Sequence, residues 1–155
     1  MRQAGKQRPE GGACSATALR KASRRVTQLY DDALEPSGLR STQFAVLSEL
    51  DRGSAKPPTM ADLARALVIE RSALGHNLKP LERDGFITLQ GGEEDRRRRH
   101  VKLTPLGRAK LAEASPLWRS AQTRFDAVFG KAASRDLRAT LLAIAHDERL
   151  ATLTD

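Results

Sequence analysis

The chain contains few of the residues on which disulfides, metal sites and base-stacking surfaces depend. Its 155 residues include a single cysteine, which excludes an internal disulfide and any CxxC motif for a metal or for redox chemistry. The histidines (His76, His100 and His146) are scattered and have no recognisable metal-ligand spacing. One tryptophan, one tyrosine and four phenylalanines disfavour a fold that binds nucleic acid mainly by stacking bases on aromatic rings. We therefore expect no metal and no cofactor.

Long apolar runs and the clustered motifs of enzymes are absent too. No apolar run approaches the roughly 20 residues of a membrane-spanning helix, and residues 1–12 lack the apolar stretch of a secretory signal. No Ser–His–Asp set, carboxylate pair or phosphate-binding glycine loop is apparent in the sequence. We expect a cytoplasmic protein that is not an enzyme and has no membrane partner.

Positive charge, by contrast, is abundant. The sequence has 27 lysines and arginines against 19 aspartates and glutamates, which gives a formal net charge of +8. A domain with this excess is expected to bind polyanions, with nucleic acid as the leading candidate. The charge alone does not distinguish a sequence-specific regulator from an architectural protein that binds DNA without sequence preference.

Prolines, glycines and capping residues divide the chain into four segments. Residues 1–12 are polar and contain several glycines, which predicts a flexible basic arm. Residues 13–37 and 105–155 have apolar side chains at spacings of three and four, which predicts amphipathic helices. Residues 38–104 lie between them and contain shorter periodic segments. The expected N-caps of three helices are Thr59 (with Asp62 as its partner in a capping box), Thr104 and Ser134.

The helix that begins at residue 105 has a seam of the coiled-coil type. The seam consists of Leu111, Ala114, Trp118, Ala121, Phe125 and Val128. A lone chain of this size could not easily cover the apolar seams at both of its ends. The terminal segments therefore predict a helical dimerisation stem, with packing of Trp118 and Phe125 inside one chain as the alternative.

The segment 38–104 has the pattern of a winged helix-turn-helix domain. Short helices are expected near residues 41–52, 60–66 and 71–83. Two β-prone runs at 86–89 and 100–103 then predict a hairpin with a long charged tip. The predicted fold class is mainly α with a small β-hairpin: a winged helix-turn-helix lobe joined to a helical dimerisation stem.

The helix at 71–83 has the features of a recognition helix, which fits the major groove and presents side chains to base edges. The side chains opposite its leucine face that we expect to contact DNA are Arg71, Ser72, Ala73, His76 and Lys79. Gly75 lies among them and lets the helix backbone come close. The hairpin tip supplies consecutive arginines, including Arg96, Arg97 and Arg98, which suit phosphates or a narrow minor groove. A solvated charged loop is the alternative for the tip.

At this point the sequence resembles the MarR family of transcriptional regulators, over nearly the whole chain. The strongest segment is LGHNLKPLERDGFITLQGGEEDRRRRHVKLTPLG, and YDDALEPSGLRSTQFAVL resembles the first two helices of the family. Asp95-x-Arg97, followed by Leu103-Thr104 and Gly107, matches the signature of its wing. By this resemblance Arg97 enters the minor groove, and Asp95 holds Arg97 or braces the wing. Gly75 and His76 stand where many relatives carry a hydroxyl residue and an arginine, so an operator preference cannot be carried over.

The resemblance also implies the assembly and the control of the protein. It implies a homodimer on a pseudopalindromic operator, acting as a repressor that a small aromatic or anionic effector releases. Tyr30, Trp118 and Arg119 could line the effector pocket, with core packing of the two aromatic rings and a solvated Arg119 as the alternative. Cys14 is expected in the first turn of the first helix, where unpaired N–H groups favour a thiolate. Cys14 is thus a candidate redox-sensing thiol, as in some members of the family, or else a small residue at a dimer contact.

Overall fold

The structure of the protein is a computed structural model that describes residues 14–53, 56–91 and 99–150. Within these residues the chain forms six α-helices and one antiparallel sheet of two strands. The predicted arm at 1–12 and the part of the hairpin tip that contains residues 95–98 lie outside the described residues. The mainly helical fold with a small β-hairpin is confirmed.

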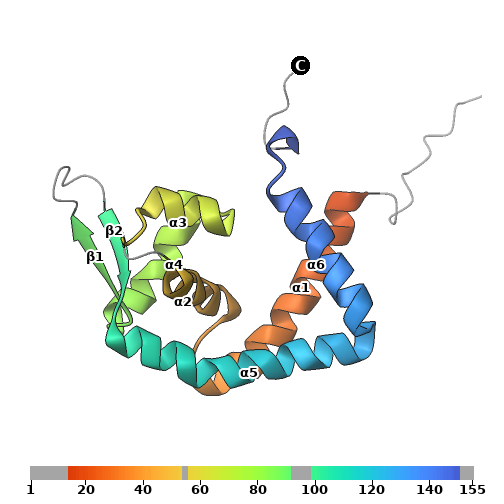
Figure 1. Cartoon of the computed structure of the whole chain (residues 1–155), viewed down its shortest axis with the longest axis horizontal. Coiled ribbons are helices and arrows are strands. Elements are labelled where there is room, and N and C mark those ends of the chain that lie inside the picture. Colours follow the sequence, from red (N-terminus) through yellow and green to blue (C-terminus); the bar gives the residue numbers. More distant parts are fainter. Residues whose placement is uncertain (1–13, 54–55, 92–98, 151–155) are drawn as a thin grey trace, which may run out of the picture.

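Three helices form the base and one arm of a U-shaped molecule (Figure 1). They are α1 (Ser15–Leu34), α5 (Pro105–Phe129) and α6 (Lys131–Ala145). The long helix α5 runs along the base, α6 rises from its C-terminal end, and α1 rises from nearer its middle and crosses α6 in both views. Short 3-10 turns lie at Glu35–Ser37 and Glu148–Leu150. We call α1, α6 and the second half of α5 the stem.

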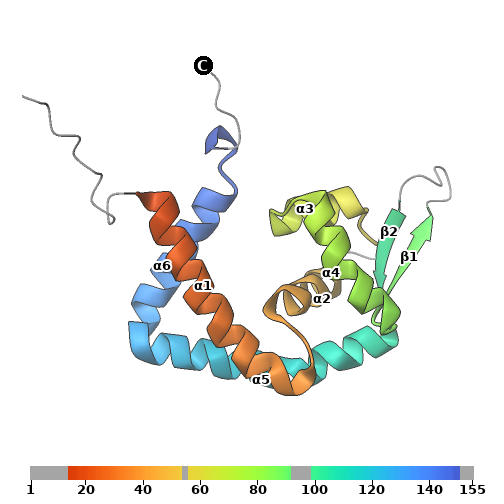
Figure 2. The ribbon, with the colours of Figure 1, turned by 180° about the vertical axis from the view of Figure 1, so that it is seen from behind.

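The other arm of the U is formed by the segment between α1 and α5, which we call the lobe (Figure 2). Its elements are α2 (Ser41–Arg52), α3 (Met60–Leu67), α4 (Arg71–Arg83), β1 (Ile87–Gly91) and β2 (Arg99–Leu103). The two strands pair antiparallel, from Ile87 opposite Leu103 to Gly91 opposite Arg99. This is the helix-turn-helix followed by a hairpin that the sequence predicts.

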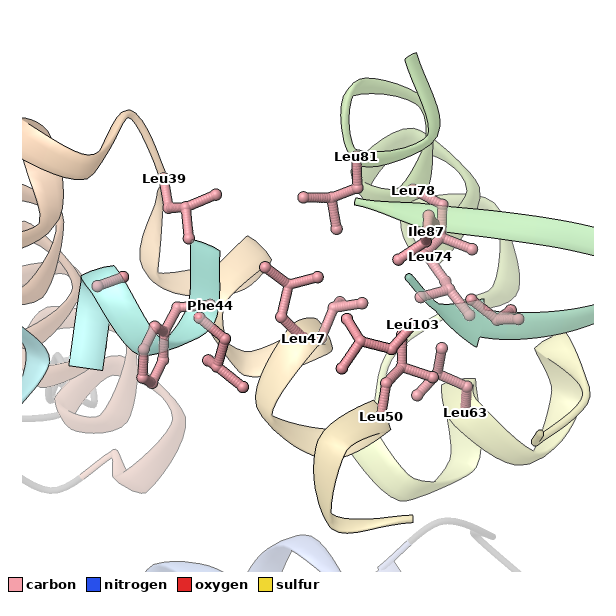
Figure 3. Packing of buried hydrophobic residues seen from close by; sticks show 14 of the residues in the cluster. Leu39, Phe44, Leu47, Leu50, Leu63, Leu74, Leu78, Leu81, Ile87 and Leu103 are labelled. Carbon is pink, nitrogen blue, oxygen red and sulfur yellow. The ribbon is translucent and has the colours of Figure 1, made fainter. Parts of the chain in front are cut away.

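Every element of the lobe contributes to one hydrophobic core (Figure 3). Leu47 of α2, Leu63 of α3 and Leu74 of α4 are each at most 1% exposed. Ile87 and Val101 close the core from the hairpin and are buried to the same degree. Each such side chain contributes about 1.5–3 kcal/mol through the apolar surface that it removes from water. The spacing of the apolar residues along each helix therefore decides which face turns inward.

The apolar seam of α5 is divided between the lobe and the stem. Leu111 and Ala114 are buried in the core that α5 shares with the lobe. Trp118 stacks on Phe44 of α2, with ring centroids 5.7 Å apart and ring planes inclined by 10°. Only the end of the seam stays open, where Val128 is 80% exposed. Trp118 therefore packs inside the chain, because the lobe sits directly on the first half of α5.

The helix starts agree with the predicted caps in part. Asp62 N donates to Thr59 Oγ1 at 3.1 Å, and Thr59 N donates to Asp62 Oδ2 at 3.3 Å, so the capping box is formed. The prediction for Ser134 is wrong, because α6 already begins at Lys131. Gly130, with a φ of +89°, turns the chain so sharply after α5 that no further linking residues are needed before α6.

A close backbone contact joins α5 to the hairpin. Thr104 Oγ1 donates to the carbonyl of Gly85 at 2.7 Å and accepts from Gly107 N at 3.0 Å, so Thr104 caps α5 as predicted. A Cβ at Gly107 would lie 2.0 Å from the carbonyl oxygen of Phe86. Only a glycine allows the first turn of α5 to lie this close to the start of β1, which fixes the lobe on α5.

Candidate nucleic-acid interface

Helix α4 has one buried and one exposed side. Leu74, Leu78 and Leu81 are each at most 1% exposed and point into the lobe core, as Figure 3 shows. Because they are spaced by four and three residues, the helical period turns the intervening residues outward. All of the side chains predicted to contact DNA from this helix are exposed: Arg71, Ser72, Ala73, His76 and Lys79. The structure thus brings them together on one surface.

The cations of α4 differ in their partners. Arg83 Nε donates to Asp84 Oδ1 at 2.9 Å, and this hydrogen bond holds the pKa of Asp84 below its ordinary value. Among the described residues, neither Arg71 nor Lys79 forms an ion pair. These two charges are therefore the ones on α4 that remain available to an external anion.

The turn between α3 and α4 has an unusual backbone. Val68 adopts the left-handed conformation, with φ +52° and ψ +48°, and its N–H bonds back to the carbonyls of Ala64 and Arg65. Glycine or asparagine usually occupies such a position, because a β-branched side chain is strained there. Val68 is also 51% exposed. The sequence pattern does not reveal this turn type, since valine is not a turn-forming residue.

The hairpin is anchored to the loop that precedes α3. The carbonyl of Pro57 accepts a hydrogen bond from His100 Nδ1 at 3.0 Å, and the carbonyl of Pro58 accepts one from Val101 N at 2.9 Å. Thr59 and His100 also form an isolated β-bridge. The hairpin is therefore held at a fixed orientation to the helix-turn-helix. Sequence reasoning missed this role of His100, although the extended backbone favoured before a proline is a signal for it.

The charged tip of the hairpin supplies the remaining predicted contacts. Asp95, Arg96, Arg97 and Arg98 lie outside the described residues, so their roles stay predictions. Arg99, the first residue of β2, is exposed at the end of the strand from which the tip begins. The described strands belong to the same lobe that presents α4 (Figure 1).

The residues predicted for an effector pocket occupy different environments. Tyr30 Oη donates to Gln122 Oε1 at 2.6 Å, and burial raises the pKa of this phenol above its ordinary value. Trp118 packs between Phe44 and Tyr30, with its ring centroid 6.0 Å from that of Tyr30. Arg119 is exposed. The structure therefore brings Tyr30 and Trp118 together at the junction of stem and lobe, with Arg119 next to them in sequence.

Two hollows lie along α1. An apolar groove of about 750 Å³ runs between α1, α5 and α6, and its lining includes Leu19, Val26, Tyr30, Phe125, Leu137 and Ile144. A second hollow of about 660 Å³ lies at the turn between α1 and α2 and is lined by charged side chains that include Arg24, Asp31 and Arg40. In that hollow Asp31 Oδ1 accepts from Ser41 N at 2.7 Å and thereby ties α1 to the start of α2.

The single cysteine stands immediately before α1, as its N-cap residue. The Thr17 side chain and then the backbone amides of Thr17 and Ala16 lower the pKa of the Cys14 thiol, although the thiol makes no capping hydrogen bond. Cys14 is exposed. Over the described part of the chain, no cluster of three or more metal-binding side chains occurs, and no helix is long and apolar enough to cross a membrane.

Comparison with known proteins gives relatives for this arrangement. The sequence profile of the MarR family matches residues 37–98. The transcriptional regulator MosR of M. tuberculosis, solved in complex with DNA, is 34% identical and has a TM-score of 0.79 over 90% of this chain and 99% of MosR. A transcriptional repressor CouR, solved on a 23-mer DNA duplex, is 28% identical, with a TM-score of 0.77 over 90% of this chain and 99% of CouR. The transcriptional activatory protein BadR of Rhodopseudomonas palustris is 40% identical over 77 residues, which are 49% of this chain and 44% of BadR. This last match therefore spans less than half of BadR.

Proposed function

The chain belongs to the MarR family of DNA-binding transcriptional regulators, and from this premise we propose that it binds a pseudopalindromic operator as a homodimer and represses transcription. The observation that carries the proposal is the outer face of α4, where small polar side chains lie between two cations that have no carboxylate partner in the described chain. Repression is favoured over activation because the repressor CouR matches over nearly its full length, whereas the match to BadR is partial. With DNA as its partner, the proposed location of the protein is the cytoplasm.

Recognition is divided between the helix and the wing. Ser72 and His76 lie at the centre of the exposed face of α4, where a major groove about 12 Å wide would receive them. A specific base contact from such a side chain is worth about 1–3 kcal/mol of discrimination. The wing would reach the adjacent minor groove with Arg97, with Asp95 bracing it. The anchored hairpin supports this arrangement, because His100 fixes the wing relative to α4.

A second copy of the chain is the proposed cover for the apolar surface of the stem. Phe129 and Leu142 are each 58% exposed. The apolar groove between α1, α5 and α6 adds further apolar surface on the same part of the stem. Monomeric soluble proteins rarely leave a continuous apolar surface of this kind in water. A two-fold dimer would set two α4 helices about one DNA turn apart, roughly 34 Å, which matches two half-sites of a pseudopalindrome.

The junction of stem and lobe is the proposed place for an effector. Tyr30 and Trp118 offer an aromatic surface there, and the neighbouring Arg119 offers a positive charge for a small aromatic or anionic molecule. A molecule inserted beside Trp118 would disturb its stacking on Phe44 and so move the lobe on α5. A small displacement of the lobe would take one α4 out of register with its half-site.

The test begins with selection of bound fragments from the source genome, followed by fluorescence anisotropy on the best site and on a random duplex. We expect a preference of at least about 10³-fold for the selected site, two chains per site, and an altered base preference for His76→Ala. Arg97→Ala should weaken binding by the same factor on all operator variants that differ at the base pairs read in the major groove. Arg52→Ala, an exposed change at the end of α2 beside Glu49, is the matched control and should bind like wild type. Equal affinity for selected and random DNA would indicate an architectural DNA-binding protein and contradict the proposal.

A further inference from the structure

A glycine occupies the interior of the helix that faces DNA. Gly75 is the fifth residue of the 13-residue helix α4, well away from both of its ends. Glycine destabilises a helix interior relative to alanine, because it loses more backbone freedom on folding. A glycine at such a position therefore calls for a steric or conformational reason.

The described chain itself supplies neither reason. A Cβ built on Gly75 meets no heavy atom of the described structure within 4 Å, whereas at Gly107 it meets the Phe86 carbonyl at 2.0 Å. Gly75 also has an ordinary helical backbone, unlike the glycines at positions 38, 85 and 130, which have positive φ. Alanine would fit at Gly75 in the free protein. The reason for glycine thus lies outside the chain.

The surroundings of Gly75 indicate the chemistry of what fills the space. Arg71 lies four residues before it and Lys79 four residues after it, so on the helix surface the gap at Gly75 separates these two side chains. Both side chains are exposed, and neither forms an ion pair with any of the described residues. This includes Glu82, which lies three residues after Lys79 on the same helix. The base-reading candidates Ser72 and His76 lie to one side of this row. A gap between two available cations suits a phosphate.

We propose that the gap at Gly75 receives the sugar–phosphate backbone of one operator strand, with a phosphate held between Arg71 and Lys79. Gly75 is then a positioning residue: its missing side chain lets the phosphate approach the helix between the two cations. This inference rests on the proposed operator binding. Phosphate contacts fix the register of a protein on DNA and carry no base information, so the effect of filling the gap is the same on all sequences.

The experiment compares Gly75→Ala and Gly75→Met with wild type by thermal unfolding without DNA and by anisotropy on the selected operator and its single-base-pair variants. Both substitutions introduce good helix formers, so the melting temperature should rise by about 2–4 °C. DNA affinity should nevertheless fall by roughly tenfold for alanine, the size of one lost charge-assisted contact, and further for methionine. The loss of affinity should be equal across operator variants. The slope of log affinity against log salt concentration should fall by the amount expected for about one phosphate contact.

Two further variants make the result specific. Thr123→Ala, which raises helix propensity on the exposed side of α5, should raise the melting temperature without changing DNA affinity. In a Lys79→Gln background, Gly75→Ala should cost less than in wild type, because the phosphate has already lost one of its partners. Wild-type affinity for Gly75→Ala overturns the inference, as does a loss confined to particular base pairs, which would place a base edge in the gap. If wild type itself prefers no sequence, the proposed function fails, and the inference fails with it.

Discussion

The substitution Gly107→Ala is expected to destabilise the protein sharply, although alanine is the better helix former. A Cβ at Gly107 would lie 2.0 Å from the Phe86 carbonyl oxygen and 2.8 Å from Cδ1 of Leu103. Ordinary nonbonded separations are about 3.5 Å, so the first turn of α5 would have to move away from the hairpin by more than an ångström. That movement would also weaken the hydrogen bond from Gly107 N to Thr104 Oγ1.

The magnitude follows from three opposing effects. Overpacking of a tight contact costs about 1–3 kcal/mol, and a weakened cap costs about 1 kcal/mol. The better helix propensity of alanine returns about 1 kcal/mol. The net loss is about 2 kcal/mol, which for a chain of this length lowers the melting temperature by about 4–8 °C.

Circular dichroism melts at one fixed protein concentration measure this effect, because the melting temperature of a dimer depends on concentration. Gly75→Ala is the matched control, since it makes the same chemical change in a helix where the Cβ meets nothing, and it should melt higher than wild type. A melting temperature for Gly107→Ala at or above that of wild type would refute the argument that backbone contact with Phe86 requires glycine.

Three more predictions concern the stem. Tyr30 is the only tyrosine, and since burial raises its pKa, ultraviolet titration should show a midpoint above that of the unfolded chain. The stability linked to this proton should be present below pH 10 or so and lost as the pH rises through the folded pKa; equal midpoints in native and denatured protein would contradict it. Leu142→Asp places a charge on the exposed apolar face of α6 and should give a folded monomer by sedimentation at micromolar concentration, whereas an intact dimer would remove this face from the interface. The neighbouring Thr17 lowers the pKa of the exposed Cys14, so peroxide should oxidise this thiol to a sulfenic acid and weaken operator binding. A thiol reductant should reduce the sulfenic acid and restore binding. Cys14→Ser should bind normally and ignore peroxide; identical responses of the two proteins would leave Cys14 with a packing role only.

The sequence predicts the helices of the lobe well because their apolar spacing and their caps agree. The predicted recognition helix at 71–83 has the bounds of α4, and Thr59 and Thr104 cap helices as expected. The hairpin is shifted by only a residue or two, since the β-prone runs are the residues that close the core. Local pattern and tertiary burial select the same residues in these elements, so the pattern is sufficient.

The sequence fails where tertiary contacts decide. Trp118 belongs to an apolar seam that is equally compatible with a second chain, and only the position of the lobe on α5 shows that it stacks on Phe44. The bond of His100 to Pro57 joins residues 43 positions apart along the chain, and the extended backbone favoured before a proline is only a weak local signal for it. Ser134 is a good capping residue by type, but the sharp turn at Gly130 starts the helix earlier.

Unfavourable local choices accumulate in the recognition element rather than in the core. Val68 holds a left-handed conformation that strains a β-branched side chain, and Gly75 lowers the helix propensity of α4. Pro80 lies inside α4 and removes the N–H that would otherwise bond to the carbonyl of His76. Departures from local preference are expected at functional surfaces, where another requirement selects the residue. The buried side of α4, with its three leucines at most 1% exposed, holds the helix in place despite these costs. The outer residues of α4 are thereby released from any role in folding, so the proposed contact with DNA can determine their identity.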